Sequence, residues 1–279
     1  MRLGGPVFGQ FGDPDRWVAA HRAKGYGAAL CPLNDPGDGD AVRAYRSAAE
    51  QGGLVIAEVG AWSNPLSPDE GERQAALALC RERLALADMI GARCCVNIAG
   101  SCGPKWDGPY PQDLTAATFD LIVESVRSII DAVQPTRTFY TLETMPWMYP
   151  DSAASYLRLL EAVDRLRFGV HLDPVNVVNS PRRYFENGAL LRECFEKLGP
   201  HIKSCHAKDV RLGDGLTVHL DEVRPGAGGL DYKVFLRELD RLDADMPLIL
   251  EHLAAEEDYD RAAAYVREVA DELGVSVRQ

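Results

Sequence analysis

Four residues that can bind a metal ion stand at the ends of short apolar runs. They are Glu143, Asp173, His206 and Glu251, and they lie 30, 33 and 45 positions apart along the chain. A strand, a helix and their two loops take about 30 residues, so this spacing predicts that the four residues end successive strands of one barrel. Because parallel strands of a barrel end at the same rim, the four side chains are expected to face a common point.

The residue types at these positions indicate a divalent cation. Side chains two apart on a strand share a face, so His206 and Lys208 are expected to point together into the barrel. Isolated carboxylates there would cost several kcal/mol each unless they were paired or bound a cation. Oxygen ligands with a single imidazole favour Mn²⁺ or Mg²⁺, with Zn²⁺ and Co²⁺ as alternatives. The competing interpretation is that Glu143 and Glu251 form ion pairs at the edge of the core and that His206 is structural.

Eight strand-like runs alternate with amphipathic helices along the chain. Each run is continuously apolar, as is typical of strands covered on both faces. The runs are GPVF from residue 5, YGAALCPL from 26, LVIAEV from 54, RCCVNIAG from 93, TFYTLET from 138, FGVHLD from 168, IKSCHAKD from 202 and PLILEHL from 247. Eight strand–helix units predict an α/β fold, a single (β/α)8 TIM barrel domain over residues 1–279, rather than an open sheet.

Local signals place the ends of the helices. Helix starts are predicted at Asp13-Pro14 and Asp151-Ser152, and helix ends at Gly25, Gly91 and Gly274. The glycine-rich stretch RPGAGGLDY at 224–232 is either a loop that covers the substrate or a plain connector.

Composition and motifs exclude several classes of function. The 279 residues include 30 Lys and Arg against 42 Asp and Glu, a net charge of −12, and no basic cluster offsets it, so no nucleic-acid partner is expected. Neither GxGxxG nor GxxxxGK[ST] is present, so no nucleotide cofactor is indicated. The chain has no long uncharged apolar run and no export signal, so we expect no membrane partner. Its 7 cysteines are expected to be free thiols in a reducing cytoplasm.

Four segments resemble those of a known family. LETMPW, HLDPVN, CHAKD and LILEHL are similar to the metal-binding strands of the xylose isomerase-like barrel superfamily, in its sugar phosphate isomerase/epimerase group, and all eight runs fall in order. The group includes ketose 3-epimerases, hydroxypyruvate isomerases, inosose isomerases and dehydratases, and endonuclease IV. The resemblance implies that Glu143, Asp173, His206 and Glu251 bind the metal. It also implies that Glu143 and Glu251 act as base and acid on the two faces of an enediolate.

The chain departs from the family pattern in ways that bear on the reaction. Many members have a histidine three residues after the aspartate, whereas Asn176 stands here, and an amide can hold a hydroxyl but cannot shuttle protons. The segment HAKD at residues 206–209 resembles the inosose dehydratase-like branch more than the hexulose epimerases. Endonuclease IV needs extra histidines for a three-metal cluster, and with 6 histidines in the chain it is the weakest relative.

These features predict a divalent-metal-dependent isomerase or epimerase that acts on a ketose or keto-polyol by proton transfer through a metal-stabilised enediolate. The alternative is a metal-dependent lyase or dehydratase that acts on a keto-sugar, keto-inositol or oxidised glycoside by β-elimination. A third interpretation is a protein that binds sugars without catalysis or serves as one subunit of a larger enzyme. The substrate's identity and phosphorylation state stay open, as does a homo-oligomeric state.

Further polar and aromatic residues are candidates for contact with a substrate. Lys208 could donate a hydrogen bond or a proton to a substrate oxygen, or form a structural ion pair with Asp209 or Glu222. His171 could orient Asp173 or a substrate hydroxyl, or be a core histidine. The other candidates are Asn176, Glu58, Asn97 and Glu222 for sugar hydroxyls, and Trp106 and Trp147 for stacking on a sugar face or for a dimer contact.

Overall fold

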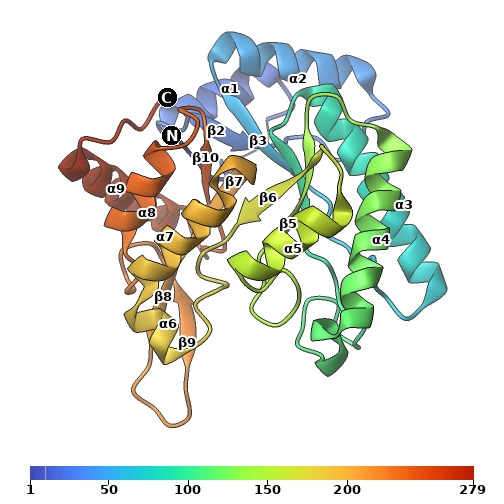
Figure 1. Ribbon diagram of the computed structural model, residues 1–279. Helices are drawn as coiled ribbons and strands as arrows, with labels where there is room; N and C mark the ends of the chain where they lie inside the picture. The colour runs from blue at the N-terminus through green and yellow to red at the C-terminus, as the bar shows by residue number, and fades with distance from the viewer. Residues whose placement is uncertain (10) are drawn as a thin grey trace.

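Eight parallel strands close into a barrel surrounded by helices in the computed structural model, which describes residues 1–9 and 11–279 (Figure 1). Around the barrel the strand order is β1-β10-β7-β6-β5-β4-β3-β2. The barrel strands are β1 Arg2–Gly4, β2 Ala28–Leu30, β3 Val55–Gly60, β4 Cys94–Asn97, β5 Phe139–Glu143, β6 Phe168–Leu172, β7 Ile202–Ala207 and β10 Pro247–Leu250. The predicted (β/α)8 TIM barrel is therefore confirmed.

Helices connect successive strands on the outside of the barrel. The α-helices are α1 Pro14–Ala23, α2 Gly39–Gly52, α3 Glu70–Ile90, α4 Ala116–Val133, α5 Ala153–Val163, α6 Pro181–Phe185, α7 Asn187–Leu198, α8 Tyr232–Asp240 and α9 Glu256–Leu273, and the 3-10 helices are η1 Pro111–Leu114 and η2 Gly199–His201. The predicted caps are present: Asp13 accepts a hydrogen bond from the Arg16 amide, Ser152 accepts one from the Ser155 amide, and Gly91 and Gly274 end their helices with positive φ. In the described part of the chain, no helix is both long and apolar enough to cross a membrane.

The prediction for the first strand was wrong in its position. The expected run was residues 5–8, whereas β1 spans Arg2–Gly4 and pairs in parallel with Pro247–Ile249 of β10. Pro6 has no amide hydrogen to donate to a neighbouring strand, so it is better suited to the loop that follows β1 than to the strand itself.

An antiparallel hairpin follows β7 directly and was not predicted. It consists of β8 Asp209–Leu212 and β9 Leu220–Val223, and it projects from the barrel (Figure 1). The glycine-rich stretch 224–232 comes next, and the backbone amides of Gly226, Gly228 and Leu230 donate hydrogen bonds to the Asp209 carboxylate. These bonds tie the stretch to the base of the hairpin, which supports its interpretation as a connector.

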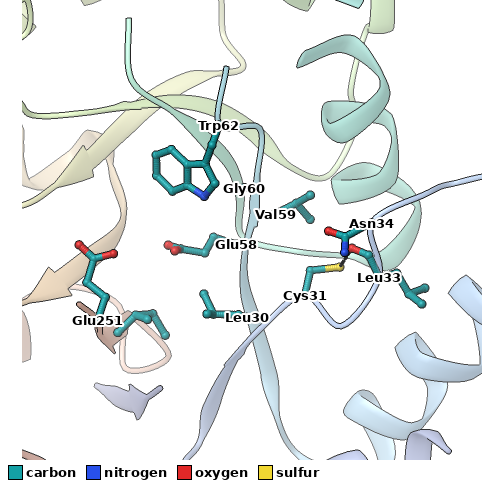
Figure 2. Close-up of a pocket in the computed structure, with 10 residues that line it drawn as sticks. Leu30, Cys31, Leu33, Asn34, Glu58, Val59, Gly60, Trp62 and Glu251 are labelled. Atoms are coloured by element: carbon teal, nitrogen blue, oxygen red, sulfur yellow. Dashed lines mark hydrogen bonds between the residues drawn. The ribbon is translucent and has the colours of Figure 1, made fainter. Parts of the chain in front are cut away.

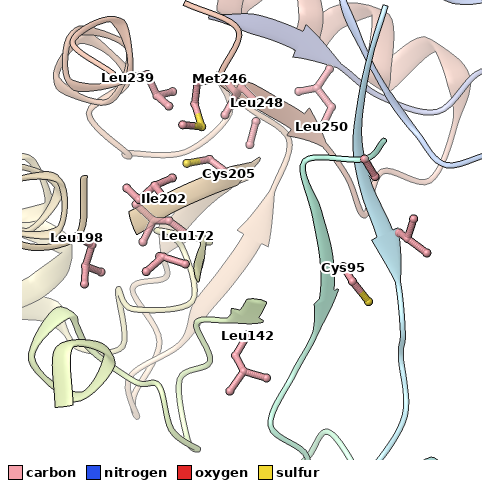
Figure 3. Packing of buried hydrophobic residues seen from close by; sticks show 14 of the residues in the cluster. Cys95, Leu142, Leu172, Leu198, Ile202, Cys205, Leu239, Met246, Leu248 and Leu250 are labelled. Atoms are coloured by element: carbon pink, nitrogen blue, oxygen red, sulfur yellow. The ribbon is translucent and has the colours of Figure 1, made fainter. Parts of the chain in front are cut away.

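Packing between the strands and the helices decides which side chains face the barrel axis. Leu142, Leu172, Cys205 and Leu250 are fully buried on the outer side of their strands, and Leu198 of α7 packs in the same cluster (Figure 3). Burying an aliphatic side chain of this size stabilises the fold by about 1.5–3 kcal/mol. Alternation along each strand then turns the next residue inward. Because these four side chains face outward, the residues that follow them face the barrel axis. Those residues are Glu143, Asp173, His206 and Glu251.

Candidate metal centre and pocket

Four ligand-bearing side chains from four strands meet inside the rim of the barrel. Glu143 ends β5, Asp173 follows β6, His206 lies in β7 and Glu251 follows β10, and one ligand atom from each lies within 4.8 Å of the others. The Nδ1 atom of His206 is 2.8 Å from Glu251 Oε1, 3.3 Å from Glu143 Oε1 and 3.9 Å from Asp173 Oδ2. Strands that are distant in sequence therefore bring three carboxylates around one imidazole nitrogen.

The donor atoms of this cluster fit a divalent cation. Asp173 Oδ2 and Glu251 Oε1 are buried and have no hydrogen-bond partner among the described residues. Both oxygens lie at ion-pair distance from Lys208 but accept no hydrogen bond, so they remain available as ligands of a bound cation. Three carboxylate oxygens and one imidazole nitrogen form a donor set that suits Mn²⁺ or Mg²⁺.

The Lys208 ammonium lies among the same carboxylates. Its Nζ atom is 2.6 Å from Glu251 Oε1 and 2.8 Å from Asp173 Oδ2, in directions that make ion pairs rather than hydrogen bonds, and it is 3.7 Å from both Glu143 and Glu222. Asp209, one of its two expected structural partners, instead accepts hydrogen bonds from backbone amides. Lys208 is therefore part of the centre and contacts Glu222 only at its edge.

Buried groups of opposite charge shift one another's pKa values in the centre. Burial acts to lower the pKa of His206, but Glu251, Glu143 and Glu58 outweigh it and raise the pKa well above its usual value. Burial acts to raise the pKa of Glu143, yet the charge of His206 keeps it below its usual value. Burial raises the pKa of Asp173 to about 7, against the opposing effect of Lys208. Positive charge on His206 and Lys208 thus compensates the carboxylates when no cation is bound.

A second polar layer lies beneath these four side chains. Glu58 of β3 accepts hydrogen bonds from His206 Nε2 at 3.2 Å, from His171 Nε2 at 2.8 Å and from Ser204 Oγ at 3.1 Å. With Nε2 directed at Glu58, His206 presents Nδ1 to the three carboxylates. Of the possibilities considered for His171, contact with Asp173 is not observed: its Nε2 atom contacts Glu58, and the residue is fully buried and lines neither of the two cavities at the centre.

A cavity of about 530 Å³ opens above the centre. It is lined by the predicted residues Glu143, Asn176, Lys208, Glu222, Glu251, Trp106 and Trp147, together with Pro6, Leu30, Trp62, Ile98, Asp107, Met145, Pro146, Leu250, His252 and Tyr259. Asn176 Nδ2 donates a hydrogen bond to Glu143 Oε1 at 3.1 Å. The amide therefore holds the Glu143 carboxylate in place.

A smaller cavity of about 220 Å³ adjoins it and shares Leu30, Trp62 and Glu251 with its lining. Figure 2 shows Glu58 and Glu251 in the lining of this cavity, with the indole of Trp62 above Glu58. The two cavities together give the centre a smaller compartment that reaches Glu58 and Asn34 and a wider outer one.

One predicted contact was wrong, and two relevant residues were missed. Asn97 is fully buried, and its amide bonds with Ser63 and Cys80 instead of lining either cavity. It lies two residues after Cys95, which packs in the core outside the barrel, so strand alternation turns Asn97 the same way. Trp62 and His252 line the larger cavity, and their positions just after strand ends were the signal that could have identified them.

Comparison with known proteins gives a family and a set of similar structures. Residues 18–269 match the family described as xylose isomerase-like TIM barrel. No curated protein matches the chain in sequence. A D-psicose 3-epimerase from Clostridium cellulolyticum H10, solved with D-tagatose, is 16% identical with a TM-score of 0.70 over 99% of this chain and 100% of that one.

Two further structures illustrate the range of relatives. A probable 3-DHS dehydratase, AsbF, involved in petrobactin synthesis in Bacillus anthracis, is 16% identical with a TM-score of 0.71, over 96% of this chain and 98% of that one. A xylose isomerase-like TIM barrel protein from Mycobacterium smegmatis, in complex with magnesium, is 18% identical with a TM-score of 0.66, over 93% of this chain and 87% of that one. At these identities the likeness shows a shared fold.

Proposed function

The chain belongs to the xylose isomerase-like TIM barrel family, and from that premise and the geometry of its centre we propose that it is a divalent-metal-dependent isomerase or epimerase of keto-sugars. The observation that carries the proposal is the convergence of Glu143, Asp173, His206 and Glu251, with two buried carboxylate oxygens that lack hydrogen-bond partners. The epimerase with bound D-tagatose and the magnesium complex among the similar structures support both the reaction class and the cation.

Glu143, Asp173, His206 and Glu251 would hold the cation, which when bound would polarise a substrate carbonyl and acidify the adjacent C–H group. Glu143 and Glu251 are then the candidates for removing that proton and returning it. Glu251 is the more accessible of the two, with 17% of its side chain exposed against 7% for Glu143. Asn176 keeps the Glu143 carboxylate in place.

A second candidate function is a lyase or dehydratase acting through the same enediolate. Lys208 supports it, because a buried ammonium beside Glu251 and Asp173 is a proton donor that a departing oxygen could use. The dehydratase among the similar structures supports it as well.

Deuterium exchange tests both candidates. The protein, loaded with Mn²⁺ or Mg²⁺, is incubated in D₂O with a panel of ketoses and 3-keto-glycosides, and substrate and products are followed by NMR and mass spectrometry. An isomerase or epimerase labels the carbon next to the carbonyl and gives a product of unchanged formula. A dehydratase gives a product that has lost water. No label and no product across the panel, with a chelator-treated sample behaving identically, would reject the proposed function.

A further inference from the structure

Three tryptophans from three different loops form the walls of the larger cavity. Trp62 follows β3, Trp106 lies between β4 and α4, and Trp147 lies between β5 and α5. Their exposed fractions are 44%, 37% and 36%, which is unusual for large apolar side chains gathered around one opening. Trp147 Nε1 donates a hydrogen bond to the Asp107 carbonyl oxygen at 3.0 Å, so it joins two of these loops without any ligand. The loop that carries Trp106 and the loop that carries Trp147 are thus held together by a hydrogen bond within the protein.

The apolar lining continues beyond the indoles. Ile98, Met145 and Tyr259 line the same cavity. A volume of about 530 Å³ lies in the range of roughly 300–1,000 Å³ that is typical of sites for drug-sized ligands. The outer compartment thus has room and apolar surface for a group attached to the sugar.

The charges around the cavity disfavour an anionic substrate. Asp107, Glu143, Glu222 and Glu251 line it, no arginine does, and Lys208 supplies its lone ammonium among the described lining residues. That ammonium already lies within ion-pair distance of Asp173 and Glu251. His252 is likewise beside Glu222. Even with a divalent cation in the centre, the carboxylates would outnumber the positive charges, and phosphate recognition ordinarily needs unpaired arginines or free backbone amides.

We propose that the substrate is an uncharged keto-glycoside whose apolar, ring-containing aglycone lies between Trp62, Trp106 and Trp147, and that sugar phosphates are not substrates. This inference rests on the proposed function, since it assigns the sugar end of the molecule to the metal centre. The smaller compartment, with Glu58, Asn34 and Glu251 in its lining, accommodates the hydroxylated end (Figure 2).

Binding measurements test this independently of turnover. Isothermal titration calorimetry of the Mg²⁺-loaded protein uses three probes: phenyl β-D-glucopyranoside, methyl β-D-glucopyranoside and glucose 6-phosphate. Phenyl glucoside is expected to bind at least about 10-fold more tightly than methyl glucoside, a difference of about 1.4 kcal/mol, and glucose 6-phosphate is expected to bind most weakly.

Matched variants test which residues cause the preference for the phenyl group. Trp62→Ala and Trp106→Ala are expected to reduce the preference for phenyl over methyl glucoside to less than about 3-fold, whereas Phe185→Ala is expected to leave it unchanged, because Phe185 is an exposed aromatic residue on α6 that does not line the cavity. Equal binding of the two glucosides, tighter binding of the phosphate, or no binding of any probe would overturn the inference. Deuterium exchange on simple ketoses without a phenyl preference would leave the reaction class standing and reject only the aglycone site.

Discussion

The floor and the mouth of the site are built on different principles. The floor consists of Glu58, His171, Ser204 and the four ligand residues, which are positioned by strands and held by mutual hydrogen bonds and ion pairs. The mouth consists of Trp62, Trp106, Trp147 and Glu222, which are supplied by loops and by the β8–β9 hairpin. Charge dominates the floor and apolar surface dominates the mouth. The floor therefore suits a constant chemistry, and the mouth suits selection among substrates.

The largest expected effect comes from changing Glu251, the proposed proton-transfer group in the floor. Glu251→Gln keeps the shape of the side chain and a potential ligand oxygen but removes the carboxylate base. We expect the deuterium exchange rate at saturating Mn²⁺ to fall at least about 100-fold, as general acid–base contributions of that order suggest. Circular dichroism is expected to be unchanged. Glu161→Gln, an exposed position on α5, is the matched control, and a near-normal rate in Glu251→Gln would reject the assigned role.

A smaller effect is expected from a change at Glu58, which lies in the polar layer beneath the four proposed ligands. Glu58→Gln leaves every ligand residue in place but weakens the hydrogen bond that orients His206. Changes of this kind typically lower metal affinity about 10- to 100-fold. Titration of the chelator-treated protein with Mn²⁺, followed by electron paramagnetic resonance, measures this loss. Unchanged affinity would mean that the layer beneath the ligands does not position His206.

A mouth residue should act on binding more than on chemistry. Trp147→Ala removes one indole and its hydrogen bond to the Asp107 carbonyl oxygen. We expect KM for the best substrate found by deuterium exchange to rise about 3- to 10-fold with kcat within about 2-fold, because the interaction is made equally before and during the reaction. Steady-state kinetics measure both. A large fall in kcat at unchanged KM would mean that this mouth residue acts on the chemical step, which would contradict the assignment of chemistry to the floor alone.

The smallest effect is expected at the tip of the hairpin. The Leu216 side chain is fully exposed and does not line the cavity, whereas Glu222 of the same hairpin does. Leu216→Ser is expected to change the free energy of unfolding by no more than about 0.5 kcal/mol, as is usual for surface positions, and to leave kcat/KM unaltered. Denaturant unfolding and kinetics check this. A marked loss of activity would extend the functional mouth to the hairpin tip.

The floor could be predicted from the sequence far better than the mouth. Strand periodicity and spacing were enough to place Glu143, Asp173, His206 and Glu251 at neighbouring strand ends. Asn97 was predicted to contact the substrate because it ends a strand. The alternation of side chains along that strand instead turns it outward, to the same side as Cys95.

The mouth depends on loops, whose conformations no periodic pattern specifies. The β8–β9 hairpin was missed because its strands span only Asp209–Leu212 and Leu220–Val223, and both mix charged and apolar residues. The hydrogen bonds of Glu58 to His171 and His206 were likewise hidden, since they join residues more than 100 positions apart.

The most direct test of the account is the metal content of the purified protein together with the ligands of that metal. Elemental analysis after loading with Mn²⁺ is expected to give one ion per chain. Asp173→Asn is expected to lose most of it while the fold is retained. Anomalous diffraction from a loaded crystal would then place the ion between Glu143, Asp173, His206 and Glu251. A protein that takes up no metal, or an ion located away from these four side chains, would contradict the proposed centre.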